Sequence, residues 1–381
     1  MAILRVVEAL AGAALVVTVL RDVFQSVVTP RPVGGFWRLG RFPVLRLWRP
    51  WRWLALRVGD APRREALLGS FGPLAVILAL VGWVAALLLG YGLLLDAMRT
   101  QIRPEPPTFW SSLYFAGTSM FTIGFGDFVP ASAPTRVVAL VAGATGLGVF
   151  AVVITFLFSL FAAFQRREVS VVMLEAAASA PPSGVTLLET FALAGILGEL
   201  PDTFRSWQTW SAEVLDSHLA FPVLGYFRSS HDNDSWISSL GAVMDAATLV
   251  ITSIDREATP GAPTSLYGRA KLMRSVGGHC IEDLVLYFGL DGDHTVGVEL
   301  QEYRQARDRL AHAGYALRPE AEAWTMFQRI RSEYAGRVNA LAEHWASPPA
   351  QWIGDRSPLK VRPQHNGRPP NHVPGVRARS G

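Results

Sequence analysis

Residues Thr122 to Asp127 read TIGFGD, a run whose residue types and spacing suit cation binding through the backbone. Gly124 and Gly126 stand two positions apart, and glycine reaches positive φ without the steric cost of a Cβ atom. This alternation lets consecutive carbonyl groups point to one side, where rings of carbonyl oxygens replace the hydration shell of an ion. The predicted ligands are the backbone carbonyl oxygens of Thr122, Ile123, Gly124 and Phe125.

Apolar stretches on both sides of this run predict the elements that position it. Three are long enough to cross a bilayer, which takes roughly 20 helical residues. They cover about residues 3–28, 71–95 and 137–164, and a shorter apolar piece at 109–121 predicts a re-entrant helix directly before the run. The chain is 50% hydrophobic with a mean hydropathy of +0.26, which is high for a soluble protein.

The residues leading into the run strengthen this interpretation. Ser112-Leu113-Tyr114-Phe115, followed by TIGFGD, resembles the pore helix and signature of the potassium-channel pore family. That family usually has Val and Tyr where this chain has Ile123 and Phe125, and both substitutions occur in potassium-selective members. The resemblance implies a passive K⁺ pore in which the carbonyl groups bind K⁺ as the permeant ion, with no other cofactor and no catalytic residue.

The chain carries a single copy of the signature. One strand cannot encircle an ion, so four copies must assemble, which predicts a homotetramer. The expected fold is therefore an all-α membrane protein, a tetrameric pore-loop channel with one extra N-terminal span and an all-helical cytoplasmic domain.

Three side chains near the signature are expected to shape the pore. Some bacterial relatives carry an acid at the position of Thr118, so Asp127 here needs another partner, for which Tyr114 is the candidate. Phe121 occupies a position where relatives often have a small hydroxyl residue. Its ring is expected either to line the cavity or to pack outward near Leu147, and the sequence leaves both open.

Glycines in the third span allow two interpretations. Gly143, Gly146 and Gly148 resemble the glycine-bearing inner helix of two-span channels, where glycine permits bending during gating. Small residues also let helices pack closely. Both roles can hold together.

Arginine predicts the orientation. The connector after the first span carries many arginines against only Asp60 and Glu65, and Arg166-Arg167 follow the third span. Positive loops stay in the cytoplasm, so the N-terminus is expected outside the plasma membrane and the C-terminus inside. A cleaved signal peptide over residues 1–20 is the alternative, disfavoured because Glu8 interrupts the apolar stretch.

The connector also interleaves Trp37, Trp48, Trp51 and Trp53 with its arginines. Tryptophan favours headgroup depth and arginine pairs with anionic lipid, so residues 31–64 are expected to contact anionic headgroups of the inner leaflet. Single-stranded nucleic acid also binds such a composition, but the adjacent spans favour lipid, and no nucleic-acid partner is expected.

The resulting organisation has five parts, with four elements inside the pore domain. The parts are an extra transmembrane helix (1–30), an interfacial connector (31–70), the pore domain (71–168), a helical cytoplasmic domain (169–345) and a disordered tail (346–381). The pore elements are an outer helix (71–98), a pore helix (108–121), the filter (122–127) and an inner helix (136–165).

The cytoplasmic part shows helical periodicity and lacks a dinucleotide-binding Gly-x-Gly-x-x-Gly motif. Residues 231–234 and 291–294 contain His and Asp, but they fit polar turns better than metal sites. Cys280 beside His279 fits helix packing better than a nucleophile. A rival hypothesis is that the chain is a membrane-anchored signalling or hydrolytic protein, in which residues 180–345 carry the main activity and the pore is secondary.

Overall fold

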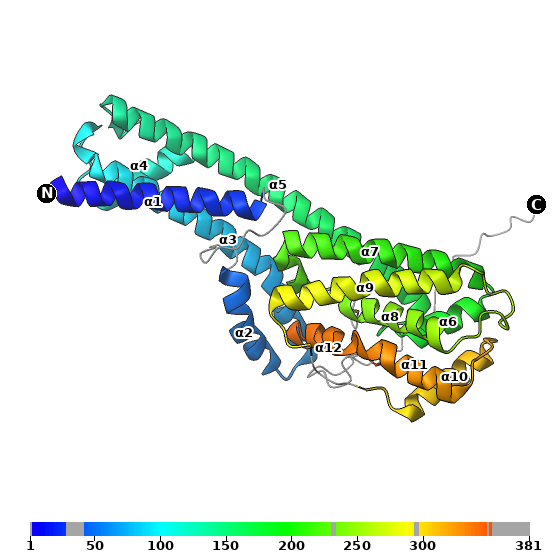
Figure 1. Cartoon of the computed structure of the whole chain (residues 1–381). Helices are drawn as coiled ribbons and strands as arrows, with labels where there is room; N and C mark the ends of the chain where they lie inside the picture. Colours follow the sequence, from blue (N-terminus) through cyan, green and yellow to red (C-terminus); the bar gives the residue numbers. More distant parts are fainter. Residues whose placement is uncertain (1, 28–41, 230–233, 293–296, 349, 353–381) are drawn as a thin grey trace, which may run out of the picture.

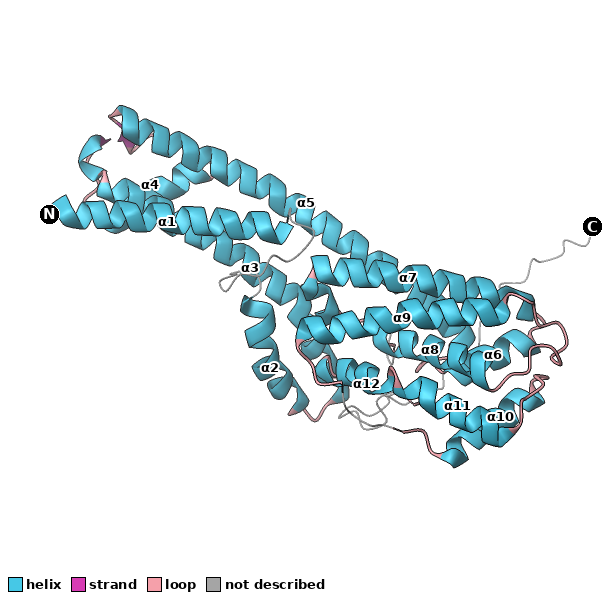
Figure 2. Ribbon diagram, viewed as in Figure 1, coloured by secondary structure: helices cyan, strands magenta, loops and turns pink. Residues whose placement is uncertain are grey.

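The computed structural model describes residues 2–27, 42–229, 234–292, 297–348 and 350–352, and these residues are almost entirely helical (Figures 1 and 2). The α-helices are α1 (Ala2–Val27), α2 (Phe42–Leu56), α3 (Ala61–Ala97), α4 (Phe109–Met120), α5 (Ala133–Ala178), α6 (Gly184–Leu193), α7 (Leu200–Ala220), α8 (Trp236–Thr252), α9 (Leu266–Phe288), α10 (Leu300–His312), α11 (Glu320–Ser332) and α12 (Ala335–His344). Three short 3₁₀ turns are η1 (Arg99–Gln101), η2 (Leu197–Glu199) and η3 (Pro222–Tyr226).

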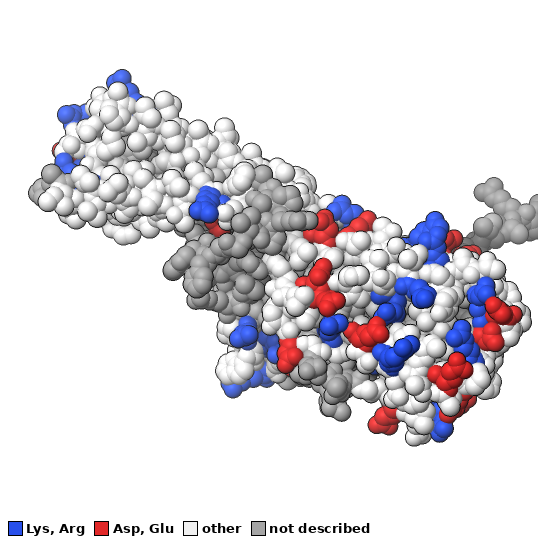
Figure 3. Space-filling model, viewed as in Figure 1, with Lys and Arg blue, Asp and Glu red and all other residues white. Residues whose placement is uncertain are grey.

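Three of these helices, α1, α3 and α5, are long and apolar enough to cross a membrane. They lie side by side with α4 between them at one end, and charged side chains gather mainly on the other part of the molecule (Figures 1 and 3). A core of its own joins them, in which Val19 of α1, Trp83 of α3 and Ala142 of α5 are buried. The all-α membrane architecture expected from the sequence is confirmed.

Local signals explain where these helices begin. Asp60 caps α3 by accepting a hydrogen bond from the Arg63 backbone N–H at 3.2 Å, and Thr108 caps α4 through the Ser111 N–H. Ser132 and Thr135 form a reciprocal capping box at the start of α5, which satisfies N–H groups that have no partner within the helix.

Two helices extend beyond their predicted limits. α3 begins at Ala61 instead of residue 71, and α5 runs from Ala133 to Ala178 instead of 136–165. The predicted limits followed hydropathy, but both helices continue into the C-terminal helical domain (residues 184–352). Leu68 on α3 and Leu174 on α5 are buried in the core of that domain, and this packing stabilises the additional turns.

The C-terminal helical domain surrounds α8, whose residues are all buried. Asp245 on α8 forms a buried salt bridge with Arg331 on α11, with a nitrogen–oxygen distance of 3.0 Å, and accepts a hydrogen bond from the Tyr334 hydroxyl. Within the described part of this domain, β pairing is confined to one bridge between Ile254 and Leu317. The expectation of a helical domain is thus met.

The connector differs from the interfacial segment expected from its tryptophans. Trp48 on α2 is buried among Phe71, Tyr226 and His344, and its indole N–H donates to the His344 carbonyl oxygen at 2.8 Å. Trp51 donates to the Leu67 carbonyl oxygen at 2.8 Å. These two side chains bind protein instead of lipid, because α2 packs against α3 and the helical domain. Trp37 lies outside the described residues.

The start of the predicted disordered tail is also wrong. Ala346, Ala350 and Trp352 are buried, and the Trp352 carbonyl oxygen accepts a hydrogen bond from Arg331. Composition gave no sign of this packing, because the segment is short and rich in proline. The tail from residue 353 onward lies outside the described residues.

Candidate functional site

The backbone of the TIGFGD run alternates in the way that the two glycines suggested. Gly124 and Gly126 have φ values of 59° and 82°. Thr122, which the sequence did not single out for this property, also has a positive φ of 56°. Every second residue from 122 to 126 is therefore left-handed, and at Thr122 this conformation is unfavourable for a residue with a branched Cβ.

The C-terminal end of α4 holds the start of the run. The Thr118 carbonyl oxygen accepts hydrogen bonds from the N–H groups of Ile123 at 2.8 Å and Gly124 at 3.3 Å. The Thr118 side chain is buried and donates to the Phe115 carbonyl oxygen at 3.1 Å. Thr118 thus positions the run through its backbone, a role that side-chain chemistry in the sequence does not reveal.

The outer end of the run is held by a side-chain contact. A hydrogen bond joins the Tyr114 hydroxyl on α4 to the Asp127 carboxylate. This is the partner that the sequence suggested for Asp127. Tyr114 also packs edge-on against Phe128, with ring centroids 6.2 Å apart. The contact fixes residue 127 relative to the helix that precedes the run.

Three bulky side chains of this region are not covered within a single chain. Phe121 is 52% exposed, Ile123 52% and Phe125 69%. Leu147, against which Phe121 could have packed, is 65% exposed. One chain by itself therefore covers neither Phe121 nor the apolar side chains of the run.

Anchors that the sequence analysis missed tie the pore elements to the outer helix. Asp96 on α3 is buried and accepts a hydrogen bond from the Ser112 hydroxyl on α4 at 2.8 Å. Strands β1 (Ile102–Arg103) and β2 (Val129–Pro130) pair antiparallel beside this contact. An aspartate near the end of one helix and a serine on the next are common in sequences. Only the fold shows that Asp96 and Ser112 are in contact.

The glycines of α5 fall into two groups. A Cβ atom built on Gly146 would lie 1.9 Å from the Met120 carbonyl oxygen, and one on Gly143 would lie 3.2 Å from that of Ser119. These two glycines admit the end of α4, which supports the close-packing interpretation. A Cβ atom on Gly148 meets nothing within 4 Å, so packing does not explain that glycine, and its role as a hinge stays a prediction.

Arg167 joins α5 to the helical domain. Its guanidinium is buried and donates to the carbonyl oxygens of Leu224 at 2.8 Å and Phe227 at 2.7 Å, and it pairs with Glu168 at 2.9 Å. His218 Nε2 lies 3.3 Å from the same guanidinium. In the sequence, Arg167 served only to predict the membrane orientation. In the structure, its buried guanidinium connects α5 to the helical domain.

Other candidate sites in the helical domain offer no reactive centre among the described residues. Burial raises the pKa of the Cys280 thiol to about 12, which keeps it protonated and supports the packing interpretation. The described residues contain no group of three or more metal-ligating side chains. Residues 231–233, 293 and 294 of the two histidine–aspartate turns lie outside the described residues.

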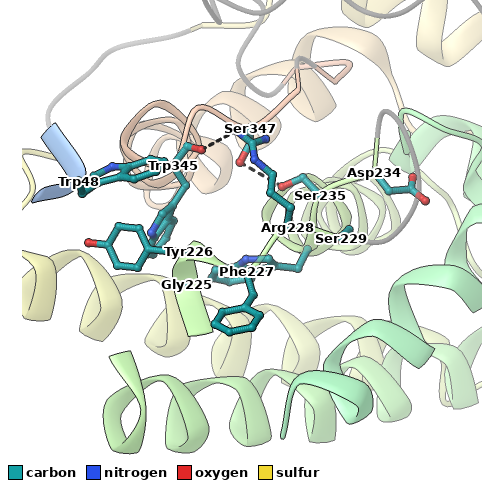
Figure 4. A pocket seen from close by; sticks show the side chains of 11 residues that line it. Trp48, Gly225, Tyr226, Phe227, Arg228, Ser229, Asp234, Ser235, Trp345 and Ser347 are labelled. Atoms are coloured by element: carbon teal, nitrogen blue, oxygen red, sulfur yellow. Dashed lines mark hydrogen bonds between the residues drawn. The ribbon is translucent and has the colours of Figure 1, made fainter. Parts of the chain in front are cut away.

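A small pocket lies where α2, η3 and the end of α12 meet (Figure 4). Trp48, Tyr226 and Trp345 form aromatic walls, and Arg228 crosses it to reach the carbonyl oxygens of Trp345 at 3.1 Å and Ala346 at 2.7 Å. Its volume is about 20 Å³, room for about one water molecule. The pocket is too small for a nucleotide or a metabolite.

Comparison with known proteins agrees with the pore geometry. Residues 74–163, which include α4, the TIGFGD run and most of the apolar part of α5, match a protein family described as "Ion channel". The chain is also 24% identical over 227 residues to "Uncharacterized membrane protein YdjJ" of Bacillus subtilis (strain 168). That match covers 58% of this chain and 65% of the relative, just under two thirds of its length.

No solved structure matches the chain significantly. The assignment therefore depends on the family match, on three helices that can cross a membrane and on the short helix α4 between two of them. Residues 74–163 therefore form an ion channel domain, and the chain is an all-α membrane channel.

Proposed function

We propose that this chain is one subunit of a potassium-selective channel that conducts K⁺ passively through a fourfold filter. The observation that carries the proposal is the alternation of left-handed residues at 122, 124 and 126. Alternation of this kind lets successive carbonyl groups face one axis, where they replace the hydration shell of K⁺. No cofactor other than the permeant ion is needed.

The proposed assembly is a homotetramer. One chain contributes one TIGFGD run, and its apolar side chains Ile123 and Phe125 are largely exposed. Neighbouring copies around a fourfold axis would cover these side chains and complete the carbonyl rings. Assembly would thus both complete the rings of carbonyl oxygens around the ion and cover the apolar side chains beside the proposed filter.

The proposed location is the plasma membrane, with the N-terminus outside and the helical domain in the cytoplasm, in agreement with the arginine distribution. Contact with anionic lipid remains part of this proposal for α2. Its face opposite Trp48 exposes Leu47, Trp53 and Leu54, and Arg57 lies 3.5 Å over the Trp53 ring. Apolar side chains beside an arginine suit the headgroup region.

Flux from reconstituted vesicles tests the function. Vesicles containing the full chain should pass K⁺ and Rb⁺ and largely refuse Na⁺. The Gly124→Ala variant should lose conduction while its oligomer stays intact, because a methyl group disfavours the left-handed conformation at that position. Equal sodium and potassium fluxes would refute potassium selectivity and leave the channel assignment standing.

A further inference from the structure

One face of α5 stays uncovered over much of the helix. Its apolar residues recur every three or four positions, which places them along one side of an α-helix. The exposed residues on this side are Leu147, Phe150, Ile154, Phe158, Phe161, Val169, Val172, Met173 and Ala176, interrupted only by the polar Gln165.

The opposite face of the same helix is occupied. Leu160, Ala163, Val171 and Leu174 are buried in the core shared with the helical domain. Figure 1 shows the membrane part of α5 along one edge of the molecule, with the other helices on one side of it, before its C-terminal end passes behind α7. The exposed residues therefore form a straight stripe on the free edge of α5.

The stripe is longer than a membrane. From Leu147 to Ala176 an α-helix rises about 44 Å, whereas the hydrocarbon core of a bilayer is about 30 Å thick. Its last four residues, Val169, Val172, Met173 and Ala176, here named the distal stripe, follow the buried Arg167–Glu168 pair. That pair binds the helical domain, so lipid tails do not reach the distal stripe.

Leaving this surface in water is unfavourable. Val169 is 59% exposed, Val172 39% and Met173 72%, and exposed apolar area costs roughly 25 cal/mol per Å² relative to burial. Large contiguous apolar surface on a protein usually marks a contact with another chain. The distal stripe therefore calls for a partner of matching length and apolar character.

We propose that the distal stripe packs against the same stripe of neighbouring copies, so that parallel α5 helices continue side by side beyond the membrane. This inference rests on the proposed tetramer, because a shared filter axis already brings the α5 helices of four copies together. The spacing of three and four residues is the one that parallel helices use to interlock apolar side chains. The distal stripe would thus couple the helical domains directly to the assembly of the pore.

Oxidative cross-linking of the full chain tests the proposal. Single cysteines are placed at Val172 or Met173 in a Cys280→Ala background, and the reconstituted protein is oxidised with copper–phenanthroline. The matched control is Leu286→Cys on α9, because Leu286 and Met173 are both 72% exposed. A second control, Val171→Cys, replaces an adjacent residue that is only 1% exposed.

The expected result is a disulfide-linked dimer for Val172→Cys and Met173→Cys, several-fold more abundant than for either control. Absence of this dimer in protein that still conducts K⁺ would overturn the inference and leave the channel function standing. If Leu286→Cys formed as much dimer, the cross-links would reflect random collision between chains, and the proposed helix contact would be overturned. Specific dimers in protein that conducts no ion would instead sustain the helix contact and refute the proposed conduction.

Discussion

Phe121 places a phenyl ring at the C-terminal cap of α4, directly before the left-handed Thr122. Its side chain is 52% exposed in the single chain, and no neighbour from α5 buries it. Around a fourfold axis, four such rings would narrow the space below the filter. The uncovered position shows that α5 of the same chain does not bury the ring.

The Phe121→Thr substitution separates these two roles. We expect it to raise single-channel conductance and to increase block by quaternary ammonium ions applied from the side of the helical domain, because four rings are removed. Planar bilayer recordings measure both quantities. If the ring packed outward instead, the variant would lose stability by roughly 2–4 kcal/mol per subunit with unchanged block, and that result would contradict the cavity assignment.

His218 lies buried beside Arg167, where α5 enters the helical domain. Burial, and secondarily the Arg167 charge, lower the pKa of His218 to about 3. Its Nδ1 lies 2.8 Å from the Val214 carbonyl oxygen, a contact that suits a neutral ring with the proton on Nδ1. The folded domain therefore keeps this histidine uncharged across the physiological range.

This pKa predicts acid sensitivity of the helical domain. Below pH 6.5 the unfolded chain takes up a proton that the folded chain does not, so stability falls as pH decreases from about 6.5 towards 3. His218 contributes a slope of at most about 1.4 kcal/mol per pH unit in this window. Chemical unfolding of the full chain at several pH values, followed by tryptophan fluorescence, measures the slope.

The His218→Gln variant should show a shallower pH dependence over the same window. His279→Gln is the matched control, because His279 is exposed on α9. An unchanged slope in His218→Gln would show that other groups account for the acid sensitivity. His344, whose pKa burial and the nearby Arg52 and Arg49 lower to about 4, contributes in the same direction and remains present in both variants.

The contact between α4 and α5 determines the position of the TIGFGD run. The end of α4 lies directly on Gly146, while the Thr118 carbonyl oxygen on the same helix holds Ile123 and Gly124. A hydrogen bond of 2.7 Å between the hydroxyl groups of Tyr91 and Thr145 fixes α5 against α3 beside this contact. Displacement of α4 would therefore move the TIGFGD run directly.

A pair of glycine substitutions tests this dependence. Gly146→Ala should strongly reduce conduction, because its methyl group would overlap the Met120 carbonyl oxygen and displace the end of α4. Gly148→Ala should leave folding intact and stabilise the helix by up to about 1 kcal/mol, because a Cβ atom there meets nothing within 4 Å. Flux and oligomer integrity are measured for both.

Normal conduction in Gly146→Ala would contradict the packing role of that glycine. The Gly148→Ala variant also reports on the hinge interpretation. Bending at residue 148 predicts altered opening in this variant with an unchanged amount of folded protein. Unaltered opening would remove Gly148 from the hinge candidates.

At the scale of the whole molecule, α3 and α5 extend without interruption from the membrane part into the helical domain. α5 alone is 46 residues long, which corresponds to about 69 Å. The buried Arg167 and the aromatic contacts of Trp48 join both helices and the connector to that domain. Two continuous helices thus connect the helical domain directly to the membrane part.

The proposed orientation predicts opposite accessibility of the start of α3 and of strand β1, which follows α3. Single cysteines are introduced at Arg63, whose side chain is 84% exposed, and at the exposed Arg103, with Cys280 replaced by alanine. An impermeant thiol reagent applied to intact cells should label position 103 and spare position 63. Labelling of both positions from outside would overturn the proposed topology and with it the cytoplasmic location of the helical domain.

The sequence by itself determined the membrane class and the alternating backbone of the TIGFGD run, because both depend on local chemistry. Apolar length defines a span without reference to any other residue. The alternation of Gly124 and Gly126 encodes a backbone conformation directly. The Tyr114–Asp127 contact was also within reach, since a missing acid at Thr118 left Asp127 without its usual partner.

Only the tertiary structure decided how far the helices extend and what the connector contacts. The limits of a span were predicted from the fall in hydropathy at its end. α5 nevertheless continues to Ala178, because the helical domain buries Val171 and Leu174. Tryptophans suit lipid headgroups and protein cores equally well, so composition could not place Trp48. The positive φ of Thr122 and the role of Gly146 likewise depend on the end of α4, a contact between segments separated in the chain.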